Sequence, residues 1–159
     1  MFEGSSKSKG KINSKLAVIE IINRQRQQNI NVTECREFSE RALQAIQQKS
    51  QKASIVFVSD AAIKKLNREF RGKDYATDLL SFPVKAEAFE KEEELNLGEV
   101  VVCLQRASEQ AKQNQISFQV EVKQLILHGL LHLSGYDHET DNGEMDRLEL
   151  RLRKRLGIA

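Results

Sequence analysis

Four apolar segments of the chain have the length and composition of β-strands. Residues 16–22 alternate loosely between apolar and polar side chains, and residues 54–58 (SIVFV) are largely β-branched or aromatic. Residues 79–84 (LLSFPV) and 98–104 (GEVVVCL) are similarly apolar. Pro83, the only proline, has no backbone N–H, and so it marks its segment as an edge strand or a strand end.

Five other segments are predicted to be helices. In chain order these are a run after Thr33 through Ile46, residues 61–70 after Asp60, residues 105–113, a long helix after Ser117, and residues 142–156. Thr33, Asp60 and Ser117 are expected to act as N-caps, because their side-chain oxygens can accept from the first free N–H groups of a helix. Two of these helices have apolar positions at helical spacing: Ile63, Leu66 and Phe70 in the second, and Met145, Leu148, Leu152 and Leu156 in the last.

The order of these elements predicts an α+β domain, with a small mixed sheet and helices packed on one face. Residues 71–78 contain Gly72 and are expected to form a loop, and the charged residues 85–94 are expected to form a solvated excursion. Residues 13–159 then make a single domain, while the small, polar and basic residues 1–12 are expected to be a disordered leader.

Composition adds only bounds on the function. The chain has 159 residues and a net charge of +2, a balance that neither demands nor excludes a nucleic-acid partner. Cys35 and Cys103 are too few for a disulfide framework and are expected to be reduced thiols. No segment approaches the roughly 20 apolar residues of a membrane span, and no signal peptide is evident, so we expect a cytoplasmic protein without a membrane partner.

The three histidines of the chain lie within the segment HGLLHLSGYDH. His128 and His132 are four residues apart, a spacing that places both imidazoles on one face of a helix. Gly135 can adopt a left-handed conformation, end the helix and turn the chain back, so that His138 reaches the same ion. Three imidazoles leave a fourth tetrahedral position for water, as in catalytic zinc sites, and we therefore predict one Zn²⁺ per chain. Nickel, copper and iron also accept imidazole ligands.

The spacing H-x3-H-x5-H with this glycine is that of the metzincin peptidases. Those peptidases have a glutamate directly after the first histidine as the general base, whereas Gly129 occupies that position here. A glycine cannot accept a proton from bound water, and so the sequence does not support peptide hydrolysis by that mechanism.

Three segments resemble the YbeY family of metal-dependent bacterial endoribonucleases: HGLLHLSGYDH, LNREFRGKDYATDLLSFP at residues 66–83, and LGEVVVC at residues 97–103. Ala76 stands where the family usually has proline, and Leu79 where valine is common. The resemblance implies helices around a four-stranded sheet. It also implies a single-strand-specific endoribonuclease that matures the 3′ end of 16S ribosomal RNA and acts in ribosome biogenesis and quality control. RNA and the small ribosomal subunit are then the expected partners, and no small organic cofactor is expected.

Arg71 matches the arginine of the family's loop segment, and a guanidinium can meet the charge that develops on a phosphate during cleavage. Lys73 is a weaker second candidate; the alternative for Arg71 is a solvated loop charge.

Asp137 could orient a histidine or the bound water, or it could stabilise the turn after Gly135. Tyr136 is expected to pack, and the general base stays open.

The last helix is rich in basic residues, among which Arg151 and Lys154 are candidates for contacts with RNA phosphates. The alternative is a solvated face on which these residues pair with Glu144 and Glu149.

Two other functions compete with the endoribonuclease. One is a zinc-dependent peptidase or amidase of metzincin-like geometry, and the other is a non-catalytic ribosome-associated protein in which zinc only holds the C-terminal turn.

Overall fold

A computed structural model describes residues 17–47, 50–84 and 95–159 of the chain. The expected leader at residues 1–12 and the expected excursion at residues 85–94 lie outside the described residues.

The described residues form one four-stranded sheet with the strand order β1-β2-β4-β3. The strands are β1 (Ala17–Asn23), β2 (Gln51–Val58), β3 (Leu79–Pro83) and β4 (Leu95–Cys103). β1 and β4 both run parallel to β2, whereas β3 pairs antiparallel with β4 and forms one edge. The sheet is therefore mixed, as the sequence predicted, and Pro83 ends the edge strand β3, where a missing N–H is tolerated.

Five helices are present in the described residues. They are α2 (Val32–Ile46), α3 (Asp60–Arg71), α4 (Leu104–Asn114), α5 (Phe118–Leu133) and α6 (Glu144–Arg155). None of them is both long and apolar enough to cross a membrane.

Two of the three predicted N-caps are wrong by one or two residues. Asn31, not Thr33, caps α2, because its side-chain oxygen accepts from the Glu34 N–H at 3.0 Å. Ser59, not Asp60, caps α3 in the same way. Asp60 instead lies in the first turn of α3, where its negative charge is favourable. The prediction for Ser117 is confirmed, since its hydroxyl accepts from Val120 N–H at 3.1 Å.

The predicted loop begins one residue too early. Arg71 is the last residue of α3, and Gly72 follows it in the left-handed region with φ of +68°. The N–H of Gly72 bonds to the Arg68 carbonyl oxygen, so the glycine ends the helix in the usual way. The last helix is shorter than predicted at its start, because Gly143 also takes a positive φ and α6 begins at Glu144.

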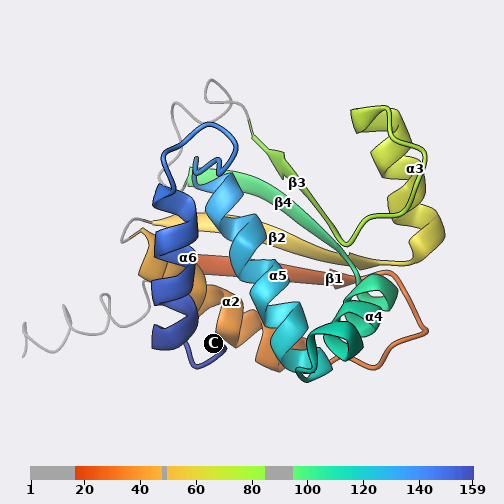
Figure 1. Ribbon diagram of the computed structural model, residues 1–159, viewed down its shortest axis with the longest axis horizontal. Coiled ribbons are helices and arrows are strands. Elements are labelled where there is room, and N and C mark those ends of the chain that lie inside the picture. The colour runs from red at the N-terminus through yellow and green to blue at the C-terminus, as the bar shows by residue number, and fades with distance from the viewer. Residues whose placement is uncertain (1–16, 48–49, 85–94) are drawn as a thin grey trace, which may run out of the picture.

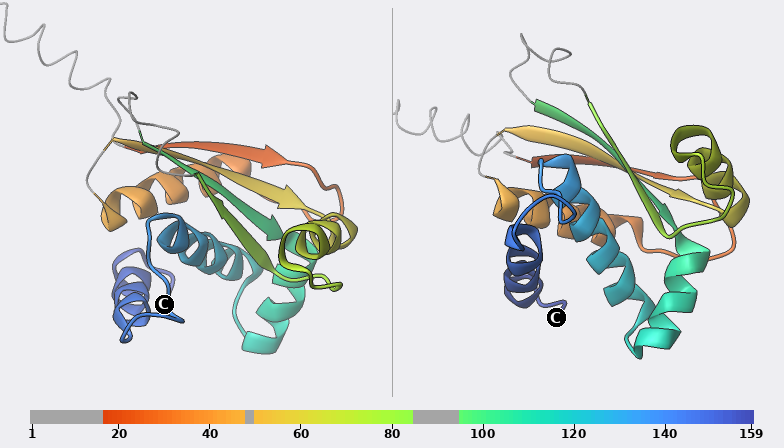
Figure 2. Two further views of the ribbon diagram at one scale, coloured as in Figure 1. Left: turned by 90° about the horizontal axis from the view of Figure 1, so that it is seen from above. Right: turned by 45° about the horizontal axis from the view of Figure 1, so that its top comes forward.

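Helices cover both faces of the sheet, and the expectation of a single covered face is wrong. The larger core cluster joins α2, α4, α5 and α6 to one face, through strand residues such as Ile55, Phe57 and Val100. Side chains alternate along a strand, so Val56 and Leu80 point to the other face, where they meet the buried Ile63 of α3. α3 therefore packs on the opposite face from the other four helices (Figure 2).

α5 is the central helix of the larger layer and crosses the sheet next to β3 and β4 (Figure 1). The close approach of α5 to the sheet depends on Gly129. A Cβ at this position would lie only 2.5 Å from Cγ1 of Val100 on β4, a residue that is fully buried. The glycine thus lets the histidine-bearing helix sit directly on the sheet.

Candidate metal centre

Two of the histidines lie one helical turn apart on α5. The Nε2 atoms of His128 and His132 are 3.2 Å apart, and their ring centroids are separated by 4.8 Å. Two donors of a tetrahedral zinc ion, each with a bond of 2.0–2.1 Å, lie about 3.3 Å apart. The helix by itself therefore sets this pair at the separation that one ion requires.

The chain reverses after α5 through a Schellman motif. Gly135 has φ of +100°, its N–H bonds to the His132 carbonyl oxygen at 3.0 Å, and the Tyr136 N–H bonds to the Leu131 carbonyl oxygen at 3.1 Å. A Cβ at position 135 would meet nothing within 4 Å, so the backbone angle, and not lack of space, requires glycine here.

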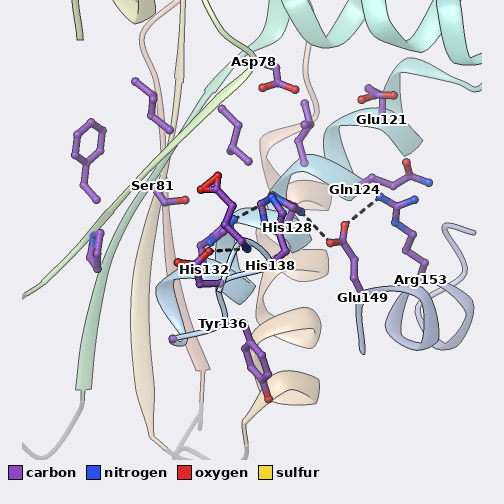
Figure 3. A pocket seen from close by; sticks show the side chains of 18 of the residues that line it. Asp78, Ser81, Glu121, Gln124, His128, His132, Tyr136, His138, Glu149 and Arg153 are labelled. Atoms are coloured by element: carbon purple, nitrogen blue, oxygen red, sulfur yellow. Dashed lines mark hydrogen bonds and ion pairs between the residues drawn. The ribbon is translucent and has the colours of Figure 1, made fainter. Parts of the chain in front are cut away.

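This turn brings His138 back to the other two histidines. One imidazole nitrogen from each of the three lies within 4.8 Å of the others, a group that could hold a metal ion. Figure 3 shows the three rings converging at the C-terminal end of α5. Burial lowers the pKa of His132, and the charges of His128 and His138 lower it further, so the neutral imidazole that a metal needs is favoured. The donor set and its spacing thus fit zinc.

A buried carboxylate holds the first histidine. Oε1 of Glu149 on α6 lies 2.8 Å from Nδ1 of His128, and the Arg153 guanidinium donates to Oε2 of Glu149 at 3.0 Å. Burial acts to raise the pKa of Glu149, but the hydrogen bond from His128 and the charges of His128 and Arg153 outweigh it and lower the pKa. An ionised carboxylate at this place keeps the proton on Nδ1 and leaves the Nε2 lone pair free for a metal.

This role of Glu149 was not predicted from the sequence, where the residue was considered only as a partner of basic residues on a solvated face, the alternative to RNA contacts. The side chain is only 8% exposed. The signal was present in the helical spacing, since Glu149 lies four residues after Met145 and three before Leu152, the two buried apolar residues of α6.

The histidines line a cleft of about 1140 Å³ between α5 and the edge strand β3. One wall is the whole of β3; the other is the face of α5 that carries Glu121, Gln124, Leu125 and the two histidines. The turn at residues 135–139 also lines the cleft, α6 contributes Glu149 and Arg153, and α3 contributes Phe70 and Arg71. The cleft therefore combines residues of α3, β3, α4, α5 and α6 that lie between positions 70 and 153 of the chain.

Some of the other predicted site residues line this cleft and others do not. Arg71 lines it, and its side chain has no hydrogen bond or ion pair with any other residue that the structure describes. Lys73, Arg151 and Lys154 are exposed and are not part of the lining; the basic residue of α6 that lines the cleft is Arg153.

Asp137 also lines the cleft, and its Oδ1 accepts from the Glu139 N–H at 3.0 Å. The carboxylate is thus engaged with the backbone of the turn. It also acts, as a smaller influence, to raise the pKa of His132. Tyr136 is half-buried and packs against the larger core cluster.

Three imidazoles that could hold a metal ion thus line one cleft with Arg71, whose guanidinium has no ion-pair partner among the described residues, and such a donor set suits a metal-using hydrolase. The family model described as "Endoribonuclease YbeY" matches residues 20–157. The chain therefore belongs to this family, whose members are named as enzymes that hydrolyse RNA internally.

Individual relatives agree with this assignment. The chain is 50% identical over 100 residues to the endoribonuclease YbeY of Alkaliphilus metalliredigens, an alignment that covers 60% of this chain and 64% of the relative. It is 33% identical over 141 residues to the protein of that name from Geobacter metallireducens, which covers 88% of this chain and 94% of the relative. The solution structure of TM1509 from Thermotoga maritima superposes with a TM-score of 0.59 at 28% identity, covering 87% of this chain and 88% of that one. The α+β fold predicted from the sequence is confirmed.

Proposed function

We propose that this protein is a zinc-dependent, single-strand-specific endoribonuclease that acts in the cytoplasm on the 3′ end of 16S ribosomal RNA, in ribosome biogenesis and quality control. The observation that carries the proposal is the convergence of His128, His132 and His138 in a cleft that Arg71 also lines, in a chain of the endoribonuclease YbeY family. The two cysteines are free and buried, as suits a reducing compartment.

In this proposal five residues of the cleft have assigned tasks. Bound zinc would polarise a phosphate oxygen and make a water molecule more acidic. His128, His132 and His138 hold the ion, and Glu149 fixes the tautomer and orientation of His128. Arg71, which has no ion-pair partner among the described residues, meets the charge of the scissile phosphate with paired N–H donors.

The test combines metal analysis with cleavage of a 16S precursor that carries its unprocessed 3′ end. Wild type is expected to bind one zinc and cleave the RNA, whereas His128→Ala loses both the metal and cleavage. Arg71→Ala is expected to lose cleavage but to retain zinc and an unchanged melting temperature. Arg68→Ala is the matched control, because Arg68 is an exposed arginine of the same helix that pairs with Asp74. Full cleavage by zinc-free His128→Ala protein would refute the metal mechanism, and loss of zinc in Arg71→Ala would refute the assignment of that arginine.

The competing peptidase is disfavoured by packing as well as by the missing carboxylate. At position 129 the direction of a Cβ leads into the Val100 side chain, so the site has no room for a glutamate there. Cleavage of a casein-like substrate by the zinc-loaded protein would revive the peptidase. Binding of zinc without cleavage of any RNA would favour the non-catalytic ribosome-associated protein.

Lys73, Arg151 and Lys154 are proposed to contact the RNA outside the cleft. All three are exposed, and none has an ion-pair partner among the residues that the structure describes. Their contribution is expected to be independent of the RNA sequence, because phosphate contacts carry no base information.

A further inference from the structure

Phe70 is exposed at the rim of the cleft, although its spacing from Ile63 and Leu66 predicts a shared apolar face. Ile63 is fully buried and Leu66 half-buried, but Phe70 is 64% exposed. Single exposed apolar residues are common and need no explanation. Phe70, however, lines the same cleft as the three histidines and directly precedes Arg71.

The Phe70 ring is held in place by a second aromatic residue. Its centroid lies 5.3 Å from that of Phe82, and the two rings meet edge to face at 74°. Phe82 is half-buried and packs against the smaller core cluster, so it forms a fixed support. The edge-to-face contact with Phe82 orients the Phe70 ring, while Phe70 keeps most of its surface in contact with solvent.

The edge strand places this aromatic pair on the far side from the histidines. Leu79 of β3 packs against the α5 layer, whereas Leu80 and Phe82 belong to the cluster under α3. The cleft therefore passes over the edge strand, from the histidines on one face of the sheet to Phe70 on the other. A flexible chain molecule bound at the metal centre can follow this path, since β3 has no neighbouring strand on its outer side among the described residues.

The charges beside Phe70 define the chemistry of the ligand. Arg71 and Lys73 have no ion-pair partner among the described residues, whereas Arg68 and Lys65 are paired with carboxylates. An exposed aromatic face next to an unpaired guanidinium fits a ligand in which planar bases alternate with phosphates.

We propose that Phe70 is a stacking platform for one unpaired nucleobase of the RNA substrate, adjacent to the phosphate that Arg71 contacts. This inference rests on the proposed endoribonuclease function and gives a physical origin for its preference for single strands. A base in a duplex has both faces stacked on its neighbours, so it cannot lie on the Phe70 ring unless the pair is broken.

The chain contains no tryptophan, which permits a direct test with Phe70→Trp as the only indole fluorophore. The zinc-loaded variant is mixed with a short 2′-O-methyl oligonucleotide that has been verified to stay uncut. Unpaired oligonucleotide is expected to quench the fluorescence, whereas the same sequence in a duplex and an abasic oligomer of equal charge are not. Tyr75→Trp is the control, because Tyr75 is 54% exposed in the following loop but does not line the cleft.

Cleavage kinetics give a second measurement. Stacking on an aromatic side chain contributes enough binding that its loss raises KM for unpaired RNA on the order of 5- to 150-fold, with a smaller effect on kcat. Phe70→Ala and Phe70→Leu are both expected to show this increase, and Phe70→Tyr is expected to restore the wild-type KM. Leucine keeps the apolar bulk without the flat ring, so it separates stacking from packing.

The outcomes separate failure of the stacking platform from failure of the proposed endoribonuclease function. An unchanged KM in Phe70→Leu, or equal quenching by duplex and unpaired oligonucleotide, overturns the stacking platform even if wild type cleaves RNA normally. Failure of zinc-loaded wild type to cleave any RNA overturns the proposed function instead.

Discussion

Replacing Gly129 with alanine should destabilise the protein, although alanine is the better helix former. Gly129 is in the interior of α5, where alanine is favoured over glycine by about 1 kcal/mol. The added Cβ would lie 2.5 and 2.9 Å from the two methyl carbons of Val100, whereas carbon atoms in contact are normally about 3.5–4.0 Å apart. Val100 is fully buried on β4, which has a strand on either side in the sheet. Either β4 or α5 must therefore move by about 1 Å.

Overpacking of this kind typically costs about 1–3 kcal/mol, which exceeds the gain in helix propensity. The net destabilisation of Gly129→Ala is therefore expected to be up to about 2 kcal/mol, with a fall in Tm of up to roughly 8 °C for a domain of this size. Val100→Ala removes both methyl groups and leaves only the Cβ of residue 100, which would lie 3.3 Å from the added Cβ of Gly129→Ala. Most of the clash is then gone, and in that background Gly129→Ala should stabilise the protein by up to about 1 kcal/mol.

Urea denaturation of the four proteins of this double-mutant cycle measures the effect. The expected coupling free energy is about 1–3 kcal/mol, with a change of sign for Gly129→Ala between the two backgrounds. Equal m-values across the four proteins would show that unfolded states are comparable. An equal loss of stability on Gly129→Ala with valine and with alanine at position 100 would refute a clash with the Val100 methyl groups.

Three further predictions follow from the turn and the last helix. Glu149→Gln should weaken zinc binding about 10- to 100-fold in a chelator competition while the metal-free protein melts normally, and Asp146→Asn, an exposed change on the same helix, should have no effect. Asp141 accepts from backbone N–H groups at the start of α6, which lowers its pKa below the usual 3.8, so its stabilisation is complete above that pH and is lost as the pH falls through the folded-state pKa. The Tm difference between wild type and Asp141→Ala should accordingly shrink below about pH 3.8, and a constant difference would contradict this role. Charge reversal at Arg151 and Lys154 should weaken RNA binding and flatten its dependence on salt, and a wild-type affinity already insensitive to salt would count against phosphate contacts.

The sequence by itself determined the parts of the site that depend on local geometry. Helical spacing alone brings two histidines to one face of α5, and the left-handed preference of Gly135 turns the third back toward them. Both effects act over less than three helical turns, so no knowledge of distant residues is needed. The elements themselves were also predictable, since their apolar periods persist in the structure; the errors fall at the ends, as at Asn31 and Gly72.

Only the tertiary structure decided what surrounds the metal centre. The order of the strands places β4 between β2 and β3, and so β3 becomes an edge although it is third in sequence. That position opens the cleft and brings Phe70 and Arg71 of α3 to the same cleft as histidines far along the chain. Glu149 meets His128 across 21 residues because α6 packs its buried face against α5. Such contacts depend on which surfaces the whole chain buries together, and so no short segment of the sequence contains them.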